Sequence, residues 1–95
     1  MRKIINGKCY NTETMTTLVR KSSYNSNGNY AGKTEICKTP GGAYAVVTTS
    51  SGQDLYRSDD IEAVDKGEIA GRIDGWKLNE EETAILVAEG IITEA

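Results

Sequence analysis

The chain lacks histidine and phenylalanine altogether, and its 95 residues include one tryptophan, one proline and two cysteines. Without histidine, the commonest general base and the usual partner of a nucleophilic serine or cysteine are missing. A zinc site would have to combine two cysteines with carboxylates, which is an unusual set for structural zinc. We therefore expect a protein that is not an enzyme and that carries no cofactor.

Long apolar runs are also lacking. No stretch approaches the roughly 20 apolar residues that span a bilayer, and no charged start leads into an apolar signal region. Cys9 and Cys37 are too few for a disulfide scaffold, so we expect both to be reduced residues of the core. These absences predict a single domain over residues 1–95 that stays in the cytoplasm and does not contact a membrane.

Acidic residues are scarce in the first half of the chain and abundant in the second. Residues 1–50 hold seven basic and two acidic side chains, a net charge of +5, whereas residues 51–95 hold four basic and twelve acidic ones, a net charge of −8. A chain divided in this way either folds its two halves against each other or presents two faces of opposite sign.

The chain begins with the pattern of a β-hairpin. Residues 4–5 and 9–10 are short strand-forming runs on either side of Asn6-Gly7. This dipeptide readily takes positive φ at both central positions of a type I′ turn. The pattern predicts a tight two-stranded hairpin, of which at least one side must be covered by another apolar surface.

Three further strands are predicted in the first half, at residues 15–23, 33–39 and 43–49, from their β-branched and apolar side chains. The turn-forming residues 24–32 predict a loop or a long hairpin tip, and the Pro-Gly-Gly at 40–42 predicts a sharp turn. Strands 33–39 and 43–49 should therefore pair with each other.

The second half is mixed in character. Residues 53–57 are predicted to extend or edge the sheet. Ser58, Asp59 and Asp60 resemble a helix start, and Gly67 would end that helix after about two turns. Residues 69–76, which contain two glycines, are predicted to be irregular or a short strand.

A C-terminal helix is the clearest expectation of the second half. Asn79 is a good N-cap, Glu82 completes a capping-box pattern, and Gly90 suits the C′ position. The side expected to cover the sheet contains Ile85, Leu86, Ala88 and Glu89. The predicted fold class is α+β, a small antiparallel sheet of about four or five strands with the C-terminal helix packed on one face.

Residues 28–34 end in Gly-Lys-Thr, as a phosphate-binding loop does. The run has three residues between its glycines where such a loop has four, and Lys33 begins a predicted strand instead of a helix. We interpret the run as a hairpin tip.

The acidic residues that follow the sheet are the main candidate site. They are Asp54, Asp59, Asp60, Glu62, Asp65 and Glu68. Their oxygen ligands suit a divalent cation, but the spacing is not that of an EF-hand loop. The other readings are a solvated acidic face and a protein-binding surface that places carboxylates where phosphates would bind. Trp76 becomes a contact candidate for such a partner if its side chain is exposed.

The basic residues permit a different function. Arg20, Lys21, Lys33 and Lys38, together with Tyr24 and Tyr30, offer cations for phosphates and rings for stacking on bases. The sequence pI near 4.9 disfavours nucleic-acid binding unless these cations are well separated from the acids.

Residues 3–8, Lys-Ile-Ile-Asn-Gly-Lys, and residues 10–14, Tyr-Asn-Thr-Glu-Thr, carry a family resemblance. This opening resembles that of small proteins of phages, plasmids and conjugative elements of Gram-positive bacteria. Weaker agreement continues at Glu35 and at residues 38–39 and 41–44. The resemblance implies a sheet with a C-terminal acidic helix, and a genetic setting that hosts inhibitors of bacterial defence. In size, acidity and absence of a catalytic constellation the chain is similar to anti-CRISPR proteins.

We therefore expect a non-enzymatic inhibitor that binds a host RNA-guided nuclease of a type II CRISPR system. Its acidic surface would act as a nucleic-acid mimic that blocks guide or target binding. The alternative is a nucleic-acid-binding accessory protein of a phage or mobile element that uses a basic sheet face. The first hypothesis requires that the acids are not neutralised by Arg20, Lys21, Lys33 and Lys38.

Overall fold

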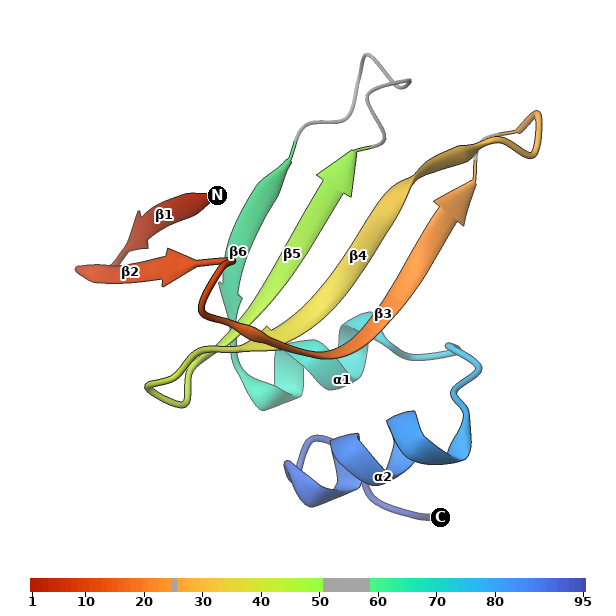
Figure 1. Ribbon diagram of the computed structural model, residues 1–95. Coiled ribbons are helices and arrows are strands. Elements are labelled where there is room, and N and C mark those ends of the chain that lie inside the picture. Colours follow the sequence, from red (N-terminus) through yellow and green to blue (C-terminus); the bar gives the residue numbers. More distant parts are fainter. Residues whose placement is uncertain (25, 51–58) are drawn as a thin grey trace.

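A four-stranded antiparallel sheet in the order β3-β4-β5-β6 lies at the centre of the fold (Figure 1). The computed structural model describes residues 1–24, 26–50 and 59–95. The strands of the sheet are β3 (Thr16–Tyr24), β4 (Tyr30–Lys38), β5 (Tyr44–Ser50) and β6 (Asp60–Val64). The predicted α+β class, with its antiparallel sheet and C-terminal helix, is confirmed. Predicted residues 53–57 lie outside the described part.

The predicted N-terminal hairpin is present as β1 (Arg2–Ile5) and β2 (Lys8–Asn11). Asn6 and Gly7 form its turn with φ of 50° and 77°, the positive values that a type I′ turn requires. The hairpin covers one face of the sheet, where buried Tyr10 belongs to the same apolar cluster as Val47 and Ile61. Ile4 points away from that cluster and is 69% exposed.

Two helices cover the opposite face, α1 (Lys66–Arg72) and α2 (Glu80–Ala88) (Figure 1). The core between helices and sheet is built around Ile36 and Val46 from the strands and Ile69 and Leu86 from the helices. Because side chains alternate along a strand, Ile36 enters this cluster while its neighbour Cys37 enters the hairpin cluster. The sheet is therefore buried on both faces, which gives a small chain two apolar layers.

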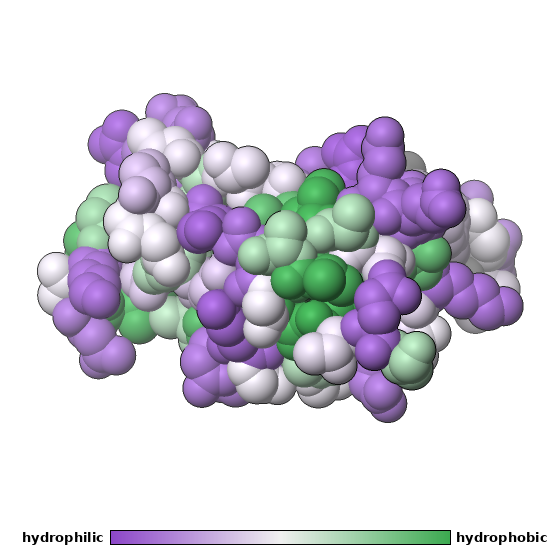
Figure 2. Space-filling view, turned by 90° about the horizontal axis from the view of Figure 1, so that it is seen from below, coloured by the Kyte–Doolittle hydropathy of each residue, from purple (hydrophilic) through white to green (hydrophobic). Residues whose placement is uncertain are grey.

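The capping of α2 agrees with the sequence, but its buried side is only partly as predicted. Asn79 and Glu82 form the expected capping box, and Gly90 has φ of 75° after the helix end. Leu86 is fully buried and Glu89 is half-buried, whereas Ile85 and Ala88 are exposed. The prediction was wrong for these two residues because α2 is apolar around most of its circumference. Figure 2, a view from the side of α2, shows an apolar patch bordered by hydrophilic residues.

Ser58 lies outside the described residues, and the prediction for residues 59–76 was wrong in two places. Residues 60–64 form strand β6, since Ile61 lies opposite Val47 in the sheet and is fully buried. The helix starts later, at Lys66, where Asp65 is the N-cap and exchanges a capping box with Glu68. Gly67 thus lies in the first turn of α1 and does not end a helix. Residues expected to be irregular from 69 onward are helical up to Arg72.

The expectation of two core cysteines was right for one of them. Cys37 is buried, and this burial raises the pKa of its thiol. Cys9 is exposed because it lies on the outer side of β2, opposite Ile4 in the hairpin. Both are free thiols.

Candidate functional site: two charged edges of the sheet

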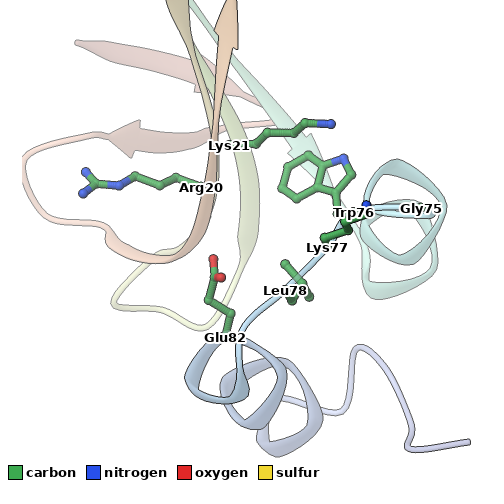
Figure 3. Close-up of a pocket in the computed structure, with 7 residues that line it drawn as sticks. All are labelled: Arg20, Lys21, Gly75, Trp76, Lys77, Leu78 and Glu82. Carbon is green, nitrogen blue, oxygen red and sulfur yellow. The ribbon is translucent and has the colours of Figure 1, made fainter.

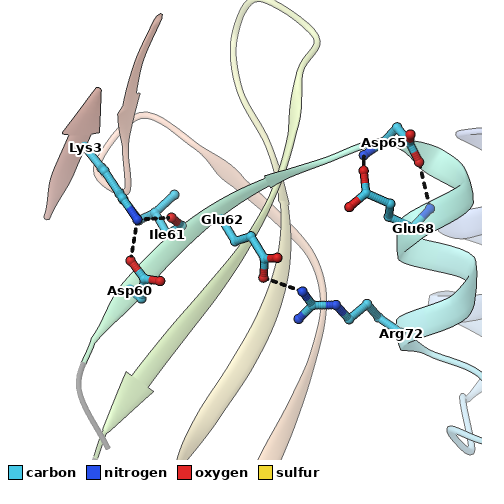
Figure 4. A network of polar contacts seen from close by, with 7 residues as sticks. All are labelled: Lys3, Asp60, Ile61, Glu62, Asp65, Glu68 and Arg72. Carbon is cyan, nitrogen blue, oxygen red and sulfur yellow. Dashed lines mark hydrogen bonds and ion pairs between the residues drawn. The ribbon is translucent and has the colours of Figure 1, made fainter. Parts of the chain in front are cut away.

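The predicted acidic residues line one edge of the sheet. Asp59 directly precedes β6. Asp60 is the first residue of β6, Glu62 lies in its middle, and Asp65 and Glu68 follow at α1 (Figure 4). All five side chains are exposed. The sixth predicted acid, Asp54, lies outside the described residues. We call these five residues the acidic strip.

The hairpin supplies the first counter-charge to this strip. Lys3 Nζ lies 2.7 Å from Asp60 Oδ1 and donates a second hydrogen bond to the Ile61 carbonyl, at 3.1 Å (Figure 4). The hydrogen bond from Lys3 holds the pKa of the Asp60 carboxyl below its ordinary value. Lys3 therefore both neutralises an acid and satisfies an outward-pointing carbonyl of β6.

The other members of the strip also bind groups of their own chain. Arg72 forms an ion pair with Glu62 across the helix face of the sheet. Asp65 and Glu68 are bound to each other's backbone N–H at 2.7 and 3.3 Å. Asp59 Oδ1 accepts a hydrogen bond from the Ser50 N–H at 2.7 Å. The carboxylates of the strip therefore already form hydrogen bonds or ion pairs within the chain in the absence of a partner.

The four cations named as possible neutralisers take no part in this. Lys33 pairs with Glu35 at 3.4 Å, and Lys38 pairs with Glu89 at 2.8 Å. Arg20 and Lys21 form no ion pair with any residue of the described ranges. The neutralisation comes from Lys3, which is far from the strip in sequence, and from Arg72 in the last turn of α1. The sequence carried no signal for these pairs.

Trp76 does not lie with the acidic strip. It is half-buried near β3, at the opposite edge of the sheet, where Lys21 Nζ lies 5.4 Å from the centroid of its ring (Figure 3). Around them is a cavity of about 360 Å³. Its lining includes Arg20, Lys21, Trp76, Lys77, Leu78 and Glu82. Sequence reasoning placed Trp76 and the acids in one site, and the structure separates them.

The cavity is electropositive. Arg20, Lys21 and Lys77 contribute three cations, and within residues 1–24, 26–50 and 59–95 none of them has a carboxylate partner within 4.0 Å. The acid in its lining, Glu82, accepts a hydrogen bond from the Asn79 N–H in the capping box of α2. The cavity therefore offers cations and an aromatic face to a ligand that carries negative charge.

The cations predicted for a basic sheet face are divided between both faces. Arg20 lies opposite Glu35 in the sheet and so shares a face with Lys33, whereas Lys21, opposite Thr34, shares the other face with Lys38. At the hairpin tip the rings of Tyr24 and Tyr30 meet edge to face at 6.2 Å between centroids. Lys33 and Thr34 lie within β4 as predicted, but β4 already begins at Tyr30, so only residues 28 and 29 of the run 28–34 belong to the hairpin tip.

Among the residues that the structure describes, no group of three His, Cys, Asp or Glu side chains is placed to hold a metal ion. None of the helices in these ranges is long and apolar enough to cross a bilayer. The fold and the two edges define a small α+β protein with polar, solvent-accessible sites.

Comparison of the chain with family models, with curated proteins and with solved structures found no match.

Proposed function

We propose that the chain is a non-enzymatic inhibitor of the anti-CRISPR type, which binds a host RNA-guided nuclease through the acidic strip. The observation that carries this proposal is the placement of five exposed carboxylates along β6 and the start of α1. The channels of such nucleases are positively charged because they hold the guide and the target strand. A row of carboxylates can bind the cationic side chains that otherwise contact the phosphates of the guide and the target.

The ion pairs within the strip are compatible with this role. The side chains of Asp60 and Glu62 remain 58% and 48% exposed in their pairs. Pairs as exposed as these contribute about 0–1 kcal/mol, so arginines of a partner can replace Lys3 and Arg72 at little cost. Hydrogen bonds between guanidinium groups and carboxylates are among the stronger polar contacts.

The test is a binding measurement with a purified type II nuclease, with and without guide RNA. We expect association that weakens as salt rises and that guide RNA reduces by competition. Replacing three acids of the strip, Asp59→Asn, Asp60→Asn and Glu62→Gln, should weaken binding at least about tenfold.

A matched control removes the same number of charges elsewhere, with Glu13→Gln, Glu81→Gln and Glu94→Gln. This variant should bind as the parent does. No association in either the presence or the absence of guide RNA would rule out the proposal, and equal losses in the two triple variants would show that total charge, not the strip, matters.

A nucleic-acid-binding accessory role is the second candidate. The observation that favours it is the exposure of Tyr24 and Tyr30, at 66% and 43%, on a hairpin whose strands carry Arg20 and Lys33. Exposed rings next to cations suit the stacking of unpaired bases. Binding of a single-stranded oligonucleotide at low salt, lost in a Tyr24→Ser and Tyr30→Ser variant, would support this role. No detectable binding at low salt would exclude it.

A further inference from the structure

The outer edge of β3 is open. β3 has nine residues, and within the described ranges its backbone makes backbone hydrogen bonds only with β4. An edge strand directs half of its N–H and C=O groups away from its neighbour, where they can pair with another chain. The opposite edge, β6, has five residues and contacts the hairpin.

Two cavities follow this open edge. One lies at Arg20 and Lys21, beside Trp76 (Figure 3). The other lies between residues 17–20 of β3 and the start of α2. Each has a volume of about 360 Å³, and both are lined by Arg20 and Glu82. They therefore form adjoining parts of a groove that runs along the strand.

The charges around residues 20 and 21 favour an acidic strand at this end of the groove, whereas the part beside α2 is lined by Glu81 and Glu82. In Figure 3, Arg20 and Lys21 point to opposite sides of β3, so each side of an added strand would face a cation. Lys77 adds a third cation on the side of Lys21. A second copy of the chain that paired antiparallel with β3 about Arg20 or about Lys21 would place that cation opposite its own copy, and like charges opposite each other are destabilising. An added strand with acids at two consecutive positions avoids this repulsion and pairs with both cations.

We propose that the β3 edge and the groove beside it bind an extended acidic peptide segment of a partner protein by strand addition. Backbone hydrogen bonds to β3 supply affinity, and the side chains of alternate residues supply specificity. Acidic side chains of the peptide contact Arg20 on one face and Lys21 and Lys77 on the other, and an apolar neighbour enters the groove beside Trp76 and Leu78. This site lies at the opposite edge from the acidic strip and does not depend on the nuclease hypothesis.

The probe is a fluorescent eight-residue peptide, Thr-Val-Thr-Glu-Glu-Thr-Val-Thr, added to the full chain. Trp76 is the one tryptophan of the sequence, so its emission reports directly on the groove. We expect saturable binding, a change in Trp76 emission, and slower hydrogen exchange of amides in residues 19–23. The same peptide with two lysines in place of the glutamates should not bind.

Charge reversal then tests the assigned residues. Arg20→Glu with Lys21→Glu should weaken binding of the acidic peptide about tenfold or more, from the loss of two cross-strand charge pairs and their replacement by repulsion. The matched control, Arg2→Glu with Lys8→Glu, makes the same change of charge on exposed hairpin residues and should bind as the parent does. Thermal melts of both variants establish that they are folded.

Four results would overturn the proposal. The first is tight binding by a peptide that is N-methylated at every residue, because strand addition needs the peptide N–H groups. The second is peptide binding without protection of the β3 amides. The third is protection of the same amides by self-association in the absence of peptide. Displacement of the peptide by an oligodeoxythymidine that leaves β3 amides unprotected would also reject it, in favour of a nucleic-acid surface.

Discussion

The two edges of the sheet are built in opposite ways. At β6 the hairpin lies alongside, Lys3 binds both Asp60 and the Ile61 carbonyl, and the strand is short. At β3 the strand is nearly twice as long and no described residue takes up its outward backbone groups. At the β6 edge the charged side chains form ion pairs within the molecule, whereas at the β3 edge Arg20 and Lys21 remain available to solvent or a partner. The basic first half of the chain and the acidic second half therefore do not neutralise each other throughout the fold.

The first prediction concerns the covered edge, where the largest loss of stability is expected. Ile61 is fully buried between β5 and the hairpin. Ile61→Ala should lower the free energy of unfolding by about 2–4 kcal/mol, because it removes buried methyl groups and leaves a cavity. Urea denaturation followed by Trp76 emission measures this. A loss below about 1 kcal/mol would mean that the hairpin does not pack on β6 as described.

The second prediction tests whether the Asn6-Gly7 turn stabilises the hairpin that packs on the sheet. Gly7 has φ of 77°, which a residue with a Cβ adopts at a cost, so Gly7→Ala should destabilise the fold by about 1–2 kcal/mol. The control is Gly71→Ala in α1, where an added Cβ meets no atom within 4 Å. That change should leave stability equal or raise it by up to about 1 kcal/mol. Denaturation midpoints of the two variants should therefore move in different directions.

The third prediction concerns the charge pair at the covered edge. Lys3→Met should raise the pKa of Asp60 towards its ordinary value, since the hydrogen bond from Lys3, the main cause of its lowering, is lost. In the parent, a lowered carboxyl pKa stabilises the fold above the pKa of the unfolded chain. This contribution disappears as the pH falls through the lower pKa of the folded state. An NMR titration of the Asp60 carboxyl measures the change, and Lys8→Met, on the same hairpin, should leave it unaltered.

The fourth prediction concerns the open edge, where the smallest effect on stability is expected. Arg20→Thr with Lys21→Thr should change the free energy of unfolding by no more than about 0.5 kcal/mol, because both side chains are exposed. The same variant should self-associate as its concentration rises, since it loses the charges that keep an open edge strand from pairing. Sedimentation velocity measures the association. A variant that stays monomeric would indicate that other features protect this edge.

Local signals in the sequence predicted much of the fold. Asn6-Gly7 predicted the hairpin because the turn depends on two adjacent residues. Asn79 and Glu82 predicted the start of α2 for the same reason. The error at residues 60–64 shows the limit of such signals. Acids before an apolar run resemble a helix start, yet Val47 on β5 offers Ile61 a partner in the sheet, and the true capping box follows at Asp65 and Glu68. That second signal is visible in the sequence and was overlooked.

The candidate sites were predicted less well than the strands. The acids of the strip all lie within residues 59–68, so their common location followed from the chain itself. Their partners Lys3 and Arg72, and the contact of Lys21 with Trp76, join residues up to 57 positions apart. No periodicity encodes such contacts.

The sequence alone determined the N-terminal hairpin, the segments of β3 to β5, the caps of α2 and the separation of charge along the chain, because each depends on residues near one another. Tertiary structure decided which edge of the sheet is covered, which acids are paired and where Trp76 lies. These features arise only when strands and helices that are distant in sequence pack together and bury shared apolar surfaces. Because the hairpin packs beside β6, the outer side of β3 has no described backbone partner.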